Sequence, residues 1–131
     1  MNPIHLKTSG VHHVALRTSN LVQSKTFYHE LLGFPLLLET ETLCILGVGN
    51  FALALKAPDS STPPTDPFSP FHRGLDHLAF AASSEKEIDR VATLLKENNI
   101  WIEGPKTDSL LSKYYVAFKD PDGIKLELYM V

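Results

Sequence analysis

The alternation of apolar and polar residues is the same in two segments that lie far apart in the sequence. Residues 11–17, Val-His-His-Val-Ala-Leu-Arg, alternate as a β-strand does. Residues 75–80, Leu-Asp-His-Leu-Ala-Phe, match the start of that segment position for position, including a histidine and the alanine two residues after it. The pattern therefore predicts two equivalent opening strands.

A pattern typical of an amphipathic helix follows each opening strand. Asn20 with Gln23, and Ser84 with Glu87, have the spacing of a capping box, in which the first side chain caps the helix. Apolar residues then recur at helical spacing in both segments, and Gly33 is expected to end the first helix.

Three short runs rich in β-forming residues come after each helix, so the order strand, helix, three strands occurs twice. A unit of this size is too small to bury a core alone, which favours packing of two such units together. We therefore predict an α+β fold of two βαβββ repeats. The expected strands after the helices are residues 34–40, 42–48, 51–57, 100–103, 113–119 and 124–130.

The composition changes abruptly between residues 58 and 74, where five of the nine prolines lie among serine, threonine and aspartate. Proline is excluded from helix interiors and central strands, so this segment is expected to be a linker or covering loop. The predicted organisation is one domain over residues 1–131, made of repeat 11–57, Pro-rich linker 58–74 and repeat 75–131.

Composition and charge narrow the class of partner. The chain has 44% hydrophobic residues and a net charge of -3, which gives no reason to expect binding to nucleic acid or to an anionic membrane. No apolar run is long enough to span a membrane, and the first ten residues lack the apolar core of a signal peptide, so we expect a cytoplasmic protein. The single cysteine, Cys44, is expected to be a small buried residue. A small molecule is the favoured partner.

The residues that point to chemistry are His13, His77 and Glu127. A period of two places each histidine, and Glu127, on the strand face opposite the apolar residues that must contact the helices. One such histidine alone is more often structural, but these two stand at equivalent positions of a repeat. Two imidazoles and one carboxylate are a ligand set for a divalent ion with open positions, such as Fe2+, Mn2+, Zn2+ or Ni2+.

These motifs resemble the vicinal oxygen chelate superfamily, which includes glyoxalase I, extradiol dioxygenases, fosfomycin-resistance thiol transferases and bleomycin-binding proteins. The resemblance covers nearly the whole chain and is carried by residues 13–17, 27–34, 75–77 and 120–127. It implies a cupped mixed β-sheet with helices on the outer face, and a metal site formed by His13, His77 and Glu127.

The resemblance also suggests which reaction to expect. Glyoxalases usually carry a glutamate on the last strand of the first repeat, and that place is held here by Ala54. Without this base, proton transfer of the glyoxalase I type is not expected. Extradiol dioxygenases carry a tyrosine near the place of Ala117, and thiol transferases a threonine at that of Ala15, so this sequence departs from both patterns.

The expected function is that of a metal-dependent enzyme, acting by dioxygenase-like or addition chemistry on a small substrate that chelates the metal through adjacent oxygens. Two alternatives remain open. One is a glyoxalase-like lyase or isomerase, and the other is a metal-free small-molecule (drug) binding protein of the bleomycin-resistance type. The resemblance further implies a homodimer, with the metal site closed within one chain or across the interface.

Four further residues are candidates for contact with the substrate. Arg17 shares the face of His13 and can pair with a carboxylate, and His72 lies in the Pro-rich linker as part of a possible lid. Tyr115 and Tyr129 are candidate pocket walls. His12 is interpreted as structural, because strand alternation turns it away from His13.

Overall fold

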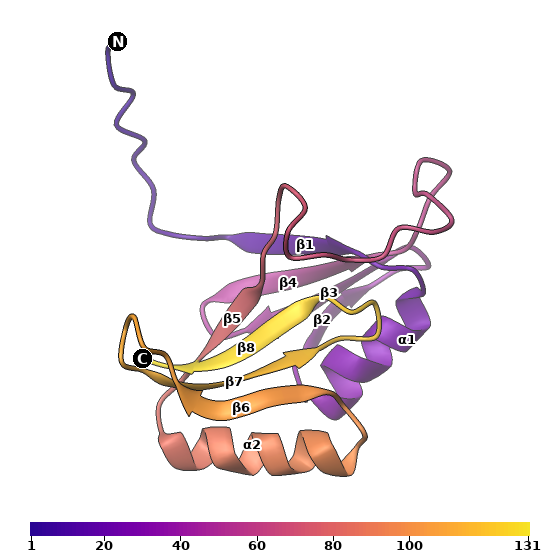
Figure 1. Cartoon of the computed structure of the whole chain (residues 1–131). Helices are drawn as coiled ribbons and strands as arrows, with labels where there is room; N and C mark the ends of the chain where they lie inside the picture. Colours follow the sequence, from indigo (N-terminus) through magenta and orange to yellow (C-terminus); the bar gives the residue numbers. More distant parts are fainter. The chain divides into compact units, whose positions relative to one another are not determined.

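The computed structural model describes residues 1–131, the whole chain, as two compact units (Figure 1). Unit 1 comprises Met1–Thr62 and unit 2 comprises Pro63–Val131. Each unit has a four-stranded mixed sheet and one helical segment, in the order strand, helix, three strands. The prediction of an α+β fold with two βαβββ repeats is therefore confirmed. None of the helices has the length and apolar character needed to cross a membrane.

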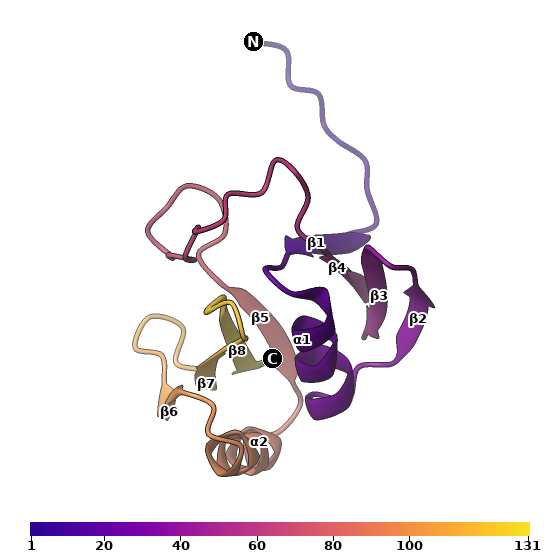
Figure 2. The ribbon, with the colours of Figure 1, turned by 90° about the vertical axis from the view of Figure 1, so that its right-hand side faces the viewer.

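In unit 1 the sheet has the strand order β1-β4-β3-β2, with β1 parallel to β4 and the other pairs antiparallel. The helical segment contacts β3 and β4 on one face (Figure 2). Leu46, Leu53 and Leu55 are fully buried and form part of the core of this unit. The elements are β1 (His13–Arg17), α1 (Leu21–Lys25), η1 (Thr26–Leu31), β2 (Leu36–Glu39), β3 (Leu43–Val48) and β4 (Phe51–Lys56).

The first helix differs from the single α-helix expected before Gly33. After α1 it continues as the wider π-helical turn η1, in which the Leu32 N–H donates to the Phe27 carbonyl at 2.9 Å. Within this wider turn two adjacent aromatic residues, Phe27 and Tyr28, are both buried. Gly33, at φ +80°, ends the segment as predicted.

In unit 2 the sheet has the equivalent order β5-β8-β7-β6, with β5 parallel to β8. Helix α2 packs on one face, where its Ile88 and Ala92 form a buried core cluster with Ala82 and Val116 of the sheet. The opposite face carries the polar residues of the candidate site. The elements are β5 (Leu78–Ala82), α2 (Glu85–Glu97), β6 (Ile102–Thr107), β7 (Tyr114–Lys119) and β8 (Lys125–Met130).

Two strands in unit 2 differ from the prediction by more than one residue at each end. The opening strand β5 begins at Leu78, so His77 stands just before it. Strand β6 runs from Ile102 to Thr107 and so includes Gly104 and Pro105, whereas the predicted strand covered residues 100–103. The sheet tolerates them because β6 is an edge strand, and its pairing with β7 is interrupted by a bulge between Glu103 and Lys106.

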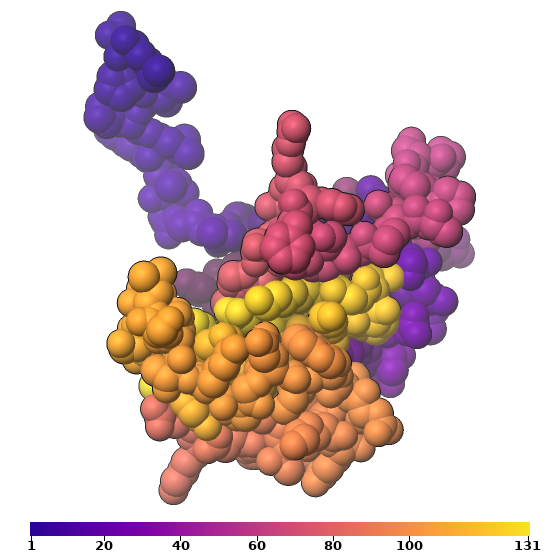
Figure 3. Space-filling view, in the orientation of Figure 1, coloured from indigo at the N-terminus to yellow at the C-terminus, as the bar shows by residue number.

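The two longest stretches without helix or strand are the Pro-rich segment and the N-terminal residues. Residues 58–74 contain no helix or strand, as the proline content predicted, and the boundary between the two units falls within them. Residues 1–10 extend from β1 as an exposed segment, seen in indigo in the space-filling view (Figure 3).

Candidate functional site

The turn before β8 determines where Glu127 lies. The carboxylate oxygen Oδ1 of Asp120 accepts hydrogen bonds from the backbone N–H groups of Asp122 and Ile124, both at 2.9 Å. Gly123 adopts a φ of +76°, a conformation that costs glycine little because it has no Cβ. This closed turn starts β8 in one register, and Glu127 stands in the middle of the strand.

The Glu127 side chain is almost fully enclosed, with 7% of the residue exposed. Its partners on the neighbouring strands are Ala79 of β5 and Ala117 of β7, whose small side chains leave space beside the carboxylate. The Nζ atom of Lys125 lies 3.7 Å from Glu127 Oε2. A carboxylate buried to this degree is costly unless a hydrogen-bond donor or a cation offsets the loss of water.

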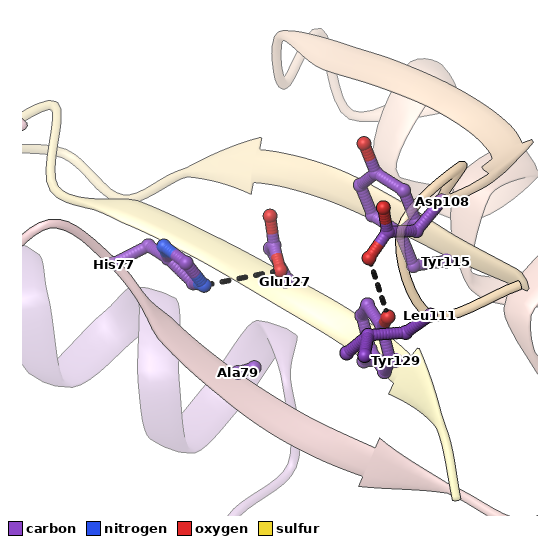
Figure 4. A pocket seen from close by; sticks show the side chains of 7 residues that line it. All are labelled: His77, Ala79, Asp108, Leu111, Tyr115, Glu127 and Tyr129. Atoms are coloured by element: carbon purple, nitrogen blue, oxygen red, sulfur yellow. Dashed lines mark hydrogen bonds and ion pairs between the residues drawn. The ribbon is translucent and has the colours of Figure 1, made fainter. Parts of the chain in front are cut away.

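His77 faces that carboxylate. Its Nε2 lies 3.3 Å from Glu127 Oε1 (Figure 4). Its Nδ1 lies 2.7 Å from Oδ1 of Asp76. When Nδ1–H donates to Asp76, Nε2 and the Glu127 carboxylate face each other as two electron-pair donors. Such a pair is stable with a proton on Nε2 or with a metal ion bound by both groups, so the two residues fit a divalent metal.

Both residues open into a cavity of about 420 Å3 in unit 2. The rings of Tyr115 and Tyr129 are stacked on one side of it, with centroids 5.5 Å apart and an interplanar angle of 27°. The cavity thus combines a polar end with an aromatic wall. It is lined by His77, Ala79, Asp108, Leu111, Tyr115, Glu127 and Tyr129 (Figure 4).

The loop between β6 and β7 supplies two lining residues that sequence reasoning missed, Asp108 and Leu111. The Tyr129 hydroxyl donates to Asp108 Oδ2 at 2.8 Å, and the Leu110 N–H donates to Asp108 Oδ1 at 2.9 Å. These bonds, with that of Leu110 the larger influence, hold the pKa of Asp108 below its ordinary value. Burial and the bond to Asp108 raise the pKa of Tyr129 to about 12. The only signal in the sequence was the pair Asp108-Ser109, which is typical of a turn.

Unit 1 has the same strand pairing as unit 2, but it has no carboxylate at the position equivalent to Glu127. Ala15 pairs with Ala54 between β1 and β4, as Ala79 pairs with Glu127 between β5 and β8. The sheet register therefore confirms that Ala54 takes the place of Glu127.

His13 is exposed at the start of β1, two residues before Ala15, as His77 is two residues before Ala79. Its Nδ1 lies 2.9 Å from the Nδ1 of His12. The interpretation that His12 turns away from His13 is wrong, because His12 precedes β1 and strand alternation does not apply to it.

The other predicted residues have different surroundings. Arg17 donates from Nη1 to the Ala57 carbonyl at 2.6 Å and lies 3.7 Å from the Asp59 carboxylate, so it contacts the start of the Pro-rich segment. His72 is exposed in that segment, and its backbone N–H donates to the Ser69 carbonyl at 3.3 Å. It does not line the cavity.

Within neither unit are three or more histidine, cysteine, aspartate or glutamate side chains gathered closely enough to hold a metal ion.

Comparison with known proteins decides the family. Residues 10–128 match the family model described as the Glyoxalase/Bleomycin resistance protein/Dioxygenase superfamily. The chain belongs to this superfamily. The duplicated βαβββ unit and the position of Glu127 beside Ala79 are thus features of a glyoxalase-superfamily protein.

Three relatives illustrate the range within the glyoxalase superfamily. The uncharacterized protein YwkD of Bacillus subtilis is 35% identical over 92% of this chain and 95% of its own length. The metallothiol transferase FosB of Staphylococcus haemolyticus is 31% identical over 92% of this chain and 82% of its own length. A solved glyoxalase family protein from Enterococcus faecalis has a TM-score of 0.76 and 35% identity, covering 92% of this chain and 97% of the other.

Proposed function

We propose that this protein is a divalent-metal-dependent enzyme that acts on a small molecule carrying two adjacent oxygen atoms. The observation that carries the proposal is the facing pair in unit 2, where His77 Nε2 lies 3.3 Å from the enclosed carboxylate of Glu127. A carboxylate and an imidazole that converge at the polar end of a cavity are common ligands of Fe2+, Mn2+, Zn2+ and Ni2+.

The proposed ligands are His77, Glu127 and His13. His13 is included because it lies two residues before Ala15, as His77 lies two residues before Ala79, and these two alanines are equivalent in the sheets of the two units. It comes from the same chain or from a second copy in a homodimer, which is the oligomeric state we propose. Light scattering checks this: a mass near the 14.6 kDa of one chain at micromolar concentration would refute the dimer.

When bound, a divalent ion supplies Lewis acidity toward the oxygen atoms of a substrate. The chain's own residues have simpler roles. The stacked rings of Tyr115 and Tyr129, with Ala79, give a wall against which a flat apolar group can pack. The Tyr129 hydroxyl donates to Asp108, so its proton is engaged there and the ring is held at the wall.

Two observations favour addition or dioxygenase-like chemistry over isomerisation. The first is Ala54, which removes the second carboxylate that would move a proton between adjacent carbons. The second is the similarity to a protein named as a metallothiol transferase, at 31% identity over 92% of this chain. Addition of a thiol to a small oxygenated electrophile is therefore the first reaction to assay, and oxygen-dependent cleavage of a catechol is the second.

The alternative function is a binding protein that needs no metal. The observation that favours it is the aromatic wall of Tyr115 and Tyr129 in a cavity of about 420 Å3, which is large enough for a ring system. Such a protein has no need of His77 beside Glu127, and we therefore place it second.

Metal analysis separates the two functions. Protein purified without chelator, and reloaded anaerobically with Fe2+, Mn2+, Zn2+ or Ni2+, is expected to hold about one ion per chain. His77→Ala and Glu127→Gln are expected to lose the ion, whereas the exposed control Asp66→Ala retains it. Less than about 0.3 ion per chain, unchanged by His77→Ala, would favour the binding protein.

The reaction is then tested with three assays in parallel. We expect turnover with a thiol and an epoxide or with a catechol and oxygen, and little with methylglyoxal and glutathione. Robust turnover in the third assay, abolished by Glu127→Gln, would contradict the role assigned to Ala54 and show that another residue supplies the base.

A further inference from the structure

Each unit places a hydrogen-bonding side chain directly before its candidate ligand histidine. In unit 2 Asp76 Oδ1 lies 2.7 Å from His77 Nδ1. In unit 1 His12 Nδ1 lies 2.9 Å from His13 Nδ1, with the two rings nearly perpendicular at 85°. In both units the Nδ1 atom of the candidate ligand histidine makes this contact. Its partner is a carboxylate in unit 2 and an imidazole in unit 1.

The ring nitrogen that donates this hydrogen bond determines which nitrogen is left to bind a metal ion. A neutral imidazole carries one proton, and a hydrogen bond donated from Nδ1 leaves the electron pair on Nε2. In unit 2 this is the nitrogen that faces Glu127. We propose that Asp76 and His12 are positioning residues, which hold His77 and His13 in the Nδ1–H tautomer so that Nε2 can bind metal. This inference rests on the proposed function.

The two positioning residues differ in the strength of the hydrogen bond that they accept. Asp76 accepts the Nδ1–H of His77 with a charged carboxylate, which orients the ring and increases the electron density on Nε2. His12 accepts the Nδ1–H of His13 as a neutral imidazole, and it must carry its own proton on Nε2 to do so. His12 is therefore the weaker support, and a carboxylate in its place should strengthen the site.

The tautomers are measured first, without metal. Long-range 1H–15N NMR of 15N-histidine-labelled apoprotein at about pH 8.5 distinguishes Nδ1–H from Nε2–H in neutral rings. The six histidines are assigned with single His→Ala variants. We expect His77 in the Nδ1–H form in the native protein and in Asp76→Asn, whose amide oxygen still accepts the bond, and a shift toward Nε2–H in Asp76→Ala.

The second measurement is the affinity for Zn2+ alone, by competition with a chromophoric chelator. Asp76→Ala is expected to weaken Zn2+ binding by about 10 to 100-fold, and Asp76→Asn by less. His12→Ala should weaken it by less than His13→Ala, and His12→Asp should strengthen it by up to about tenfold. Asp66→Ala removes an exposed negative charge from unit 2 and serves as the control for long-range charge.

The outcomes separate this inference from the proposed function. If His77→Ala loses Zn2+ while Asp76→Ala leaves both the tautomer and the affinity unchanged, the metal site stands and the positioning role of Asp76 is wrong. If His12→Ala loses Zn2+ as completely as His13→Ala, and His12→Asp does not strengthen binding, His12 is a ligand and its positioning role is wrong. If His13→Ala, His77→Ala and Glu127→Gln all leave the affinity unchanged, the proposed function itself is wrong.

Discussion

Asp120 is expected to be the polar residue outside the cavity whose loss most weakens unit 2. Its carboxylate accepts two backbone N–H groups, those of Asp122 and Ile124, at 2.9 Å each, and only 6% of the residue is exposed. Hydrogen bonds to a charged acceptor contribute about 1.5–3 kcal/mol each, and a donor left unpaired in the interior loses that contribution. With partial relaxation of the turn, Asp120→Ala should cost about 3 kcal/mol.

The matched variant is Asp120→Asn, which keeps an acceptor oxygen in the same place and should cost about 1 kcal/mol. Urea unfolding followed by circular dichroism measures both, with the exposed Asp66→Ala as control. Because domains of this kind are stable by about 5–15 kcal/mol, the alanine variant remains folded at low urea and its transition is measurable. An alanine variant within about 0.5 kcal/mol of the control would refute the role given to the turn.

Other substitutions test separate features. Leu126→Ala removes a fully buried side chain beside Glu127 and should cost about 2–5 kcal/mol in urea unfolding. Burial raises the pKa of the Cys44 thiol, so a disulfide reagent should label it slowly until urea is added. Because the thiol ionises at lower pH in the unfolded chain, the free energy of unfolding should fall as pH rises above the ordinary thiol pKa. Tyr129→Phe removes a donor to Asp108, and carboxyl NMR should show the pKa of Asp108 rise toward its ordinary value. Ala54→Glu places a carboxylate where 6% of the residue is exposed, which should lower stability in chelator-containing buffer and increase turnover of methylglyoxal with glutathione.

The fold could be predicted because the same pattern of strand, helix and three strands occurs twice. The pattern did not predict two local features that depend on how the elements pack. The π-helical turn η1 follows α1 where Phe27 and Tyr28 are both buried, and no spacing rule for an α-helix anticipates it. Strand β6 continues through Gly104 and Pro105 because it lies at the sheet edge, a position known only once the strand order is known.

The candidate site was predictable to a different degree for each residue. The period of two placed Glu127 on the face opposite the helix, and the repeat related His77 to His13. Asp108 and Leu111 lie on the loop between β6 and β7, and they reach the cavity only through the path of that loop, which no periodicity describes. The contact between Asp76 and His77 could not be predicted, because strand alternation places adjacent residues on opposite faces. Since β5 begins after His77, Asp76 is free of that rule and contacts it.

The difference between the two units bears on the chemistry more than their similarity does. The register that pairs Ala79 with Glu127 in unit 2 pairs Ala15 with Ala54 in unit 1, so the duplicated strands offer one carboxylate rather than two. A second carboxylate at Ala54 would give a bound ion a fourth protein ligand and a base beside the substrate. In the proposed site, its absence would leave one more position for an exogenous group, such as a thiol or dioxygen. Under the proposed function, the residue at this strand position would separate proton transfer from addition, and an alanine there is the feature of unit 1 that favours addition.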